Sequence, residues 1–244
     1  MRGAATAAAL ACVVSWSLAT PCAAQTAEIT AFSSGAVGTT LPAPWAPMRI
    51  NERKLLTRYD LVDDAGKVVL HARADKAASG LVHNTRVNLA STPMLTWRWK
   101  TDAPVAGADP HVGSREDAPL RVVLEFEGDR SKLPFADRAV DGFSEKVAGR
   151  PLPYATLMYV FAENIPIGTV VPNPHTRRIQ MVVVDNGAGV RAWNTLTRNV
   201  REDYKRAFGE EPGAVTAIGV LTDTDNTSGS AEAWYGDMRF SAQP

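Results

Sequence analysis

Hydrophobic and polar residues alternate along much of the chain, which is the pattern of a β-strand with one buried face. In the segment 95–100, a leucine and two tryptophans fall on one face, while a threonine, an arginine and a lysine fall on the other. The segment 122–127 repeats the alternation, with three hydrophobic residues on one face and Val123, Glu125 and Glu127 on the other. Further strands are predicted at Lys67–Ala74, Leu81–Leu89, Thr156–Phe161, Ile179–Asp185, Val215–Thr222 and Ala231–Phe240.

The sequence also predicts two short helices, at Asp137–Ala148 and Asn199–Phe208. The second helix is marked at both ends. Asn199 is followed three residues later by Glu202, which is a capping-box pattern. Gly209 can adopt the left-handed conformation that ends a helix.

The balance of many strands and few helices argues against a chain of alternating βα units. We therefore predict an all-β, mainly antiparallel fold: a two-sheet β-sandwich of jelly-roll type with one or two short helices. Asp64–Lys67 is predicted to be a hairpin turn, with Gly66 supplying a positive φ. The two longest polar loops, 102–117 and 165–175, do not separate segments able to fold alone, so residues 25–244 are predicted to form a single domain.

The first 24 residues are typical of a secretory signal peptide. Arg2 supplies a positive charge, Ala4–Ala19 is an apolar run, and small residues at Cys22 and Ala24 precede a cleavage site before Gln25. No later segment approaches the ~20 apolar residues of a membrane span. We therefore expect cleavage near Ala24 and a soluble protein in the periplasm or outside the cell.

Composition then narrows the classes of function. The chain has 26 basic and 26 acidic residues, and removal of the leader leaves 25 and 26, so no basic field is present to attract nucleic acid. Both cysteines, Cys12 and Cys22, lie in the leader. Disulfides, zinc–thiolate sites and a cysteine nucleophile are therefore excluded from the mature chain.

The polar faces of the two alternating strands are the first candidate site. If the strands line one groove, cations and carboxylates converge beside tryptophans, which suits the binding of a sugar. The alternative is that Arg98 and Glu125 form a cross-strand ion pair on a solvated face. The candidate ligand-binding residues are Arg98, Lys100, Arg121, Glu125, Trp193, Asp223 and Asp225.

Paired carboxylates would instead suit the hydrolysis of a glycosidic bond. Glu125 with Glu127, or either with Asp223, are the candidate pairs. The standard hydrolase, zinc-protease and phosphate-loop motifs are missing, and the four histidines show no metal-ligand spacing. The sequence therefore favours a binding protein over an enzyme and identifies no catalytic residue.

The acidic loop after residue 222 is a candidate calcium site, and no other cofactor is expected. Asp223, Asp225 and Asn226 offer hard oxygen ligands of the kind that Ca²⁺ prefers. The alternative, which we favour, is a turn in which these side chains cap the backbone.

A second cluster consists of Trp193, Arg198, Asn199 and Asp203. Arg198 and Asp203 flank the start of the predicted helix, so we expect them to anchor that helix to a sheet edge. Trp193 is interpreted as a core residue, with a role in ligand binding as the alternative.

The segments 93–100, 193–209 and 219–240 together resemble domain of unknown function 3047, a bacterial exported family. The resemblance extends from Phe32 to Phe240 and implies an exported, single-domain β-sandwich, without an established activity or catalytic residue. The opening segment 32–45 and the closing strand also resemble the paired terminal strands of galactose-binding-type sandwiches.

Three hypotheses of function follow. The first is a non-catalytic binding or accessory module for a glycan or cell-envelope polysaccharide. The second is a polysaccharide-cleaving enzyme that uses paired carboxylates. The third is an envelope scaffold that binds another protein, which requires an exposed apolar patch.

Overall fold

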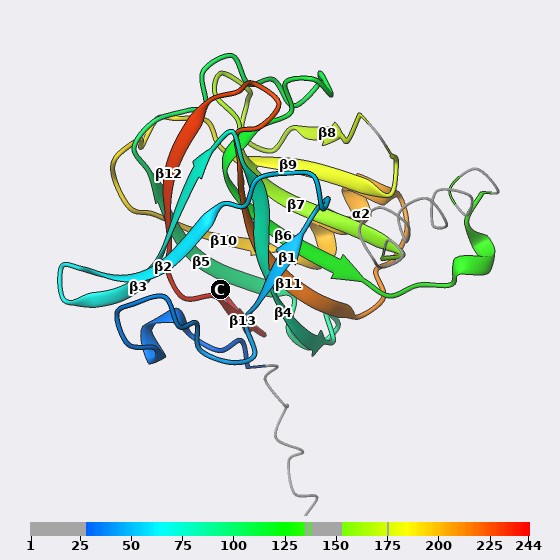
Figure 1. The fold of residues 1–244 in the computed structure, drawn as a ribbon. Helices are drawn as coiled ribbons and strands as arrows, with labels where there is room; N and C mark the ends of the chain where they lie inside the picture. The colour runs from blue at the N-terminus through cyan, green and yellow to red at the C-terminus, as the bar shows by residue number, and fades with distance from the viewer. Residues whose placement is uncertain (1–27, 135–136, 138–152, 175) are drawn as a thin grey trace, which may run out of the picture.

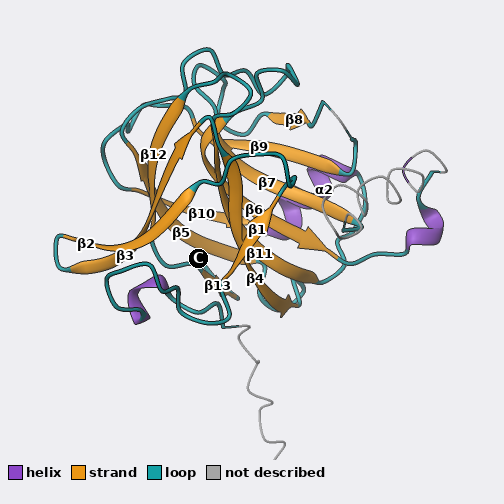
Figure 2. Cartoon of the chain, viewed as in Figure 1, coloured by secondary structure: helices purple, strands orange, loops and turns teal. Residues whose placement is uncertain are grey.

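The computed structural model describes residues 28–134, 137, 153–174 and 176–244. These residues form two β-sheets packed face to face with one α-helix at the side, which confirms the predicted all-β sandwich (Figures 1 and 2). The strands are β1 (Ala46–Arg49), β2 (Arg58–Asp64), β3 (Lys67–Asp75), β4 (Ala78–Val87), β5 (Met94–Thr101), β6 (Ala118–Phe126), β7 (Ala155–Phe161), β8 (Val170–Pro172), β9 (Ile179–Asp185), β10 (Asn194–Asn199), β11 (Val215–Asp223), β12 (Ser230–Tyr235) and β13 (Arg239–Ser241). Two short 3₁₀ helices, η1 (Phe32–Ser34) and η2 (Arg130–Lys132), complete the described elements.

The two sheets have seven and six strands within the described part of the chain. The larger sheet has the order β1-β4-β11-β6-β7-β9-β8, and its pairs are antiparallel except for β7 with β9. The smaller sheet has the order β10-β5-β12-β3-β2, with β13 also paired to β5. The larger sheet thus contains one parallel pair, β7 with β9, while the remaining strand pairs of both sheets agree with the predicted antiparallel fold.

Strand β5 shows how the sequence pattern builds the core. Its odd-numbered residues are buried and its even-numbered residues are half-buried. Trp97 and Trp99 are buried between the sheets, and the Trp97 ring stacks on Tyr159 of β7 with 5.1 Å between ring centres. Burial of rings this large is the main stabilising contribution to such a core. The same alternation leaves the even-numbered side chains of β5 on the outer face of the smaller sheet.

The second alternating strand, β6, differs from the expectation. All nine of its residues are buried, including Arg121 and Glu125, which were predicted to lie on an exposed polar face. Strand β6 is the fourth of seven strands and is flanked on both sides, by β11 and β7, so it lies in the interior of the larger sheet. Arg121 and Glu125 also belong to a different sheet from Arg98, so neither the shared groove nor the Arg98–Glu125 ion pair is formed.

The predicted C-terminal strand is interrupted. The segment expected as one strand forms β12 and β13, separated at Gly236–Met238, and both pair with β5. The break is held by polar contacts: the Gly236 N–H donates to the Arg98 carbonyl at 2.9 Å, and Asp237 accepts from both the N–H and the hydroxyl of Ser33 at 3.0 and 2.6 Å. The opening and closing segments of the described chain are therefore joined, beside the outer face of the smaller sheet.

The helix predicted at Asn199–Phe208 is present as α2 (Val200–Phe208). The Asn199 side chain accepts the Glu202 N–H, and Gly209 has a φ of 75°, as the capping pattern predicts. The expected anchor is also formed, because buried Asp203 accepts from Arg198 of β10 at 2.8 Å and from Tyr159 of β7 at 2.9 Å. Residues 138–148 of the other predicted helix lie outside the described residues.

Two further features bear on the sequence predictions. The hairpin turn between β2 and β3 is formed as expected, with positive φ at Ala65 and Gly66. Among the described residues, no helix combines the length and the apolar character that crossing a membrane requires.

Candidate functional site

The outer face of the smaller sheet carries a row of aromatic and charged side chains. Lys100 of β5 lies opposite Trp234 of β12, which in turn lies opposite His71 of β3. The Lys100 Nζ is 4.6 Å from the centre of the Trp234 ring. The His71 ring stacks on the same Trp234 ring, with 4.6 Å between ring centres and 5° between the ring planes. His71 Nε2 also lies 2.8 Å from Glu232 Oε2. The Trp234 ring therefore contacts both of its neighbours, Lys100 and His71, and these contacts hold the three side chains in place.

Trp193, directly before β10, extends this row at the sheet edge. The guanidinium carbon of Arg98 lies 4.3 Å from the centre of the Trp193 ring, and Lys100 Nζ lies 5.2 Å from it. Asp64, at the end of β2, accepts a hydrogen bond from Trp193 Nε1 and another from Lys100 at 3.2 Å. The Trp193 hydrogen bond, followed by Lys100, lowers the pKa of Asp64 below its usual value. Trp193 is therefore not the core residue that the sequence suggested.

An open hollow of about 450 Å³ lies between the tip of the β2–β3 hairpin and strands β5 and β10. Figure 1 shows this hairpin projecting from the sandwich, with the blue segment that contains η1 running beside it. We call this space the sheet-face hollow; it is lined by Ser33, Gly66, Lys67, Val68, Thr96, Trp97, Arg98, Thr195 and Asp237. Hydroxyl and charged groups thus surround an open space large enough for one or two sugar rings.

Arg98 is held in a fixed position at this hollow. Its side chain lies between the Trp193 ring and the backbone of Gly236, where an added Cβ would come within 2.5 Å of Arg98 Cγ. Among the described residues, its guanidinium group has neither a hydrogen bond nor an ion pair. Lys67 is exposed and likewise has no such partner in the described part of the chain. Asp237 is already engaged by Ser33. The hollow therefore offers positive groups that the protein itself does not use.

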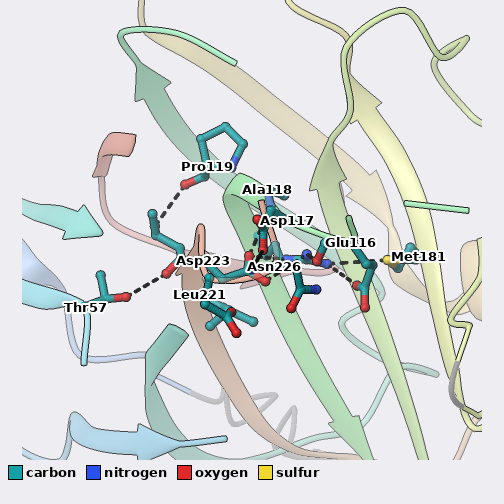
Figure 3. Close-up of polar contacts among 12 residues, drawn as sticks. Thr57, Glu116, Asp117, Ala118, Pro119, Met181, Leu221, Asp223 and Asn226 are labelled. Carbon is teal, nitrogen blue, oxygen red and sulfur yellow. Dashed lines mark hydrogen bonds and ion pairs between the residues drawn. The ribbon is translucent and has the colours of Figure 1, made fainter. Parts of the chain in front are cut away.

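A second polar cluster lies at one end of the larger sheet, where the buried Arg121 of β6 meets Asp223 of β11 and Glu116 of the preceding loop. Figure 3 shows Glu116, Asp117 and Asp223 of this cluster. The guanidinium donates to both oxygens of Asp223, at 2.9 and 3.2 Å, and to Glu116 Oε1 at 2.9 Å. Burial raises the pKa of Asp223 to about 6, an effect that Arg121 opposes. Burial alone would lower the pKa of Arg121, but Asp223 and Glu116 together raise it. The cluster is a buried ion-pair network rather than an open site.

The predicted calcium ligands lie at the edge of this network. Oxygens of Asp117, Asp223 and Asp225 lie within 4.8 Å of one another, so the loop does bring carboxylates together, with Asp117 as a member that the sequence did not suggest. Asp117 accepts the backbone N–H groups of Asn226 and Thr227 at 3.2 and 2.7 Å.

The charges of this acidic group are largely used inside the protein. Lys54 pairs with Asp225 at 2.7 Å, and Arg121 holds Asp223. Asp225 Oδ1 is the one carboxylate oxygen of the group that is buried without a hydrogen-bond partner among the described residues. Asp117, Asp223 and Asp225 are the residues that would hold a cation here. The turn is capped by Asp117, which the sequence did not suggest, rather than by its own Asp225 or Asn226.

The predicted site residues thus separate into two places. Arg98, Lys100 and Trp193 come together on the outer face of the smaller sheet. Arg121, Asp223 and Asp225 come together at one end of the larger sheet, and Glu125 is buried elsewhere in β6.

Each carboxylate proposed for hydrolysis is buried or already paired within the protein. Glu125 is buried in β6, and Asp223 is bound to Arg121. Glu127 forms a two-pronged pair with Arg86 at 2.7 and 2.8 Å, and this hydrogen bonding lowers its pKa. A general acid needs a raised pKa and access to substrate, and none of these three groups combines both.

Sequence reasoning did not find Asp64, Asp237 or Trp234 as members of the candidate site. Asp64 was assigned only to a turn, and the 129 positions between it and Trp193 carry no local signal of contact. Trp234 lies in a predicted strand between Ala233 and Tyr235, which are both buried. Because successive side chains of a strand point to opposite faces, the sequence could have indicated that the Trp234 ring faces outward.

Comparison with known proteins gives a family and likenesses to solved structures. The model of a family described as "Protein of unknown function (DUF3047)" matches residues 43–239. No curated protein matches the sequence. Among solved structures, the chain is similar to the glycoside hydrolase domain of Endo-D from Streptococcus pneumoniae R6, with 11% sequence identity and a TM-score of 0.32. The alignment covers 82% of this chain but only 21% of that structure, so the chain spans about a fifth of its length.

Proposed function

The chain belongs to the DUF3047 family, and we propose that it is an exported protein that binds a polysaccharide in the sheet-face hollow without cleaving it. The observation that carries this proposal is the lining of the hollow: hydroxyls of Ser33, Thr96 and Thr195 beside the positioned guanidinium of Arg98. Such groups donate and accept the hydrogen bonds that sugar hydroxyls make.

Three further points support a binding role. The hollow is open at the surface, which suits one part of a long polymer better than a small molecule enclosed on all sides. Among the described residues that line it, Asp237 is the one carboxylate, whereas glycoside hydrolysis ordinarily requires a pair. The predicted leader at residues 1–24 supports export to the periplasm, where envelope polysaccharides are found.

The scaffold hypothesis has less support. Exposed large hydrophobic residues in the described chain are Val37, Leu55, Leu56 and Ile167. These four residues come from three separate segments of the chain, and no described segment exposes more than the pair Leu55 and Leu56, whereas a protein-binding surface requires a contiguous apolar patch.

Affinity gel electrophoresis of the exported chain tests the proposal. Gels contain starch, mixed-linkage β-glucan, galactomannan, alginate or polygalacturonate, and we expect at least one of them to retard the protein. Thr195→Trp fills the hollow from an exposed position of β10 and should abolish the retardation. Ser114→Trp places the same ring on the exposed 102–117 loop and serves as the matched control.

Two results would overturn the proposal. One is unaltered migration in every gel. The other is retardation of Thr195→Trp equal to that of the unmodified protein, because binding would then occur outside the hollow.

A further inference from the structure

We infer that the polysaccharide bound in the sheet-face hollow is acidic, and that Arg98 recognises its anionic group. This inference rests on the proposed function and specifies the chemistry of its ligand. The structural basis is a mismatch between the cations and the carboxylates that surround the hollow.

The first step of the argument concerns Arg98 itself. A half-buried guanidinium with five N–H donors has normally found an acceptor, as Arg121 and Arg198 have in this protein. Arg98 has no acceptor among the described residues. Asp64 is nevertheless near, because the charge of Arg98 contributes to lowering the pKa of Asp64. Asp64 directs its oxygens instead to Trp193 and Lys100. The guanidinium donors are therefore available to a ligand.

The second step concerns how Arg98 is held. Trp193 covers its guanidinium at 4.3 Å, and Gly236 leaves space for its aliphatic part. A guanidinium that is already oriented loses less conformational entropy when it forms two parallel hydrogen bonds to a carboxylate, sulfate or phosphate. A neutral sugar hydroxyl would use only part of this geometry.

The third step is the charge around the hollow. Lys67 lies in its lining, and Arg239 of β13 lies opposite Thr96 and is exposed. Neither cation has an ion pair within the described residues. The carboxylate in the lining, Asp237, already accepts two hydrogen bonds from Ser33. Ser33 does not neutralise the charge of Asp237, so the lining holds two cations, Lys67 and Arg98, against one carboxylate, and Arg239 adds a third cation beside it. The net charge of these groups is positive, so the local field attracts an anion. The chain as a whole has no net charge, so this attraction is local.

The test compares polygalacturonate with the same polymer after full methyl esterification, which removes the charge and keeps the backbone. Isothermal titration with the exported chain should give at least tenfold tighter binding to the charged polymer, since a bidentate charged contact contributes roughly that much or more. Dextran sulfate against dextran forms a second arm, which separates sulfate from carboxylate as the anion. A charged polymer that binds at least tenfold tighter than its neutral partner in either arm supports the inference.

Variants assign the effect to Arg98. Arg98→Ala should remove the preference for the charged polymer, and Arg98→Lys should retain only part of it, because an ammonium keeps the charge but not the paired donors. Gly236→Ala tests positioning, since its Cβ displaces the Arg98 side chain while the guanidinium remains, and it should also weaken the preference. Arg177→Ala removes an exposed cation before β9 of the other sheet and is the matched control.

The inference and the proposed function fail in different ways. Equal binding of charged and neutral polymers in both arms, or a full preference in Arg98→Ala, would overturn the inference. If the inference fails in this way but Thr195→Trp still abolishes the binding of a neutral polysaccharide, the proposed function is retained. Circular dichroism of each variant verifies that the fold is intact before its affinity is compared.

Discussion

Arg98 and Trp193 meet on the outer face of the smaller sheet, with the guanidinium carbon 4.3 Å from the centre of the indole ring. Trp193 is held in turn by Asp64 at the end of the β2–β3 hairpin, so one tryptophan links the hairpin to β5 and β10. This relationship places a positive group at the hollow and keeps it from folding onto a carboxylate of the protein. The proposed function and its ligand chemistry both depend on it.

The hydrogen bond from Trp193 should set the pKa of Asp64. The pKa of Asp64 is lowered in the folded protein, chiefly by that bond, so its contribution to stability is present above the unfolded pKa of ~3.9 and is lost as the pH falls through the lower folded value. Carboxyl-carbon NMR of Asp64 should show a titration midpoint below the ordinary value. Trp193→Phe, which removes the N–H donor, should move the midpoint upward. An identical midpoint in both proteins would show that the bond does not control this carboxyl.

The buried pair of Arg121 and Asp223 should be essential to the fold. Within the described part of the chain, Asp223→Ala leaves the buried guanidinium with Glu116 as its one charged partner, and loss of one member of a buried pair costs about 3–5 kcal/mol. Urea unfolding measures this loss. Arg201→Ala breaks an exposed pair with Glu211 and should cost less than about 1 kcal/mol. Comparable losses in the two variants would contradict the account.

Calcium should leave the stability of the protein unchanged. Lys54 and Arg121 already neutralise part of the acidic group of Asp117, Asp223 and Asp225, and backbone N–H groups occupy the Asp117 oxygens. Thermal unfolding in EDTA and in millimolar Ca²⁺ should give the same midpoint. A rise of several degrees with Ca²⁺ would show that the ion binds the folded state and that the turn is a metal site.

The predicted leader should be removed on export. Expression in a bacterial host followed by mass spectrometry of the periplasmic protein should give a chain that begins at Gln25. Ala24→Arg places a large charged residue at the cleavage position and should leave the leader attached. A full-length chain in the cytoplasm would contradict export.

The sequence predicts the long strands inside the two sheets, whether one or both of their faces are buried, and misses those at the sheet edges. Strand β5 alternates cleanly because one of its faces packs on the core and the other is exposed to the outer surface. Strands β1, β2, β8 and β10 are short or mostly polar, and each lies at the end of a sheet, where a buried face is small and the periodic signal is weak.

The candidate site was predictable only where its members share a strand. Arg98 and Lys100 are two residues apart on β5, so the pleat alone places them on one face. Arg121 and Glu125 showed the same local pattern, but their burial depends on where β6 lies in the sheet, which the pattern does not contain. The Asp64–Trp193 contact joins distant segments and became visible only in the fold.

The most direct test of the central claim is an NMR titration of the protein with trigalacturonate, with its methyl ester as the neutral counterpart. The side-chain Nε–H signal of Arg98 and the backbone amide signals of Lys67 and Thr195 are followed. We expect saturable shifts of these signals with trigalacturonate and weaker ones with the ester. Unchanged signals at these residues, or saturable shifts confined to another part of the surface, would contradict the account.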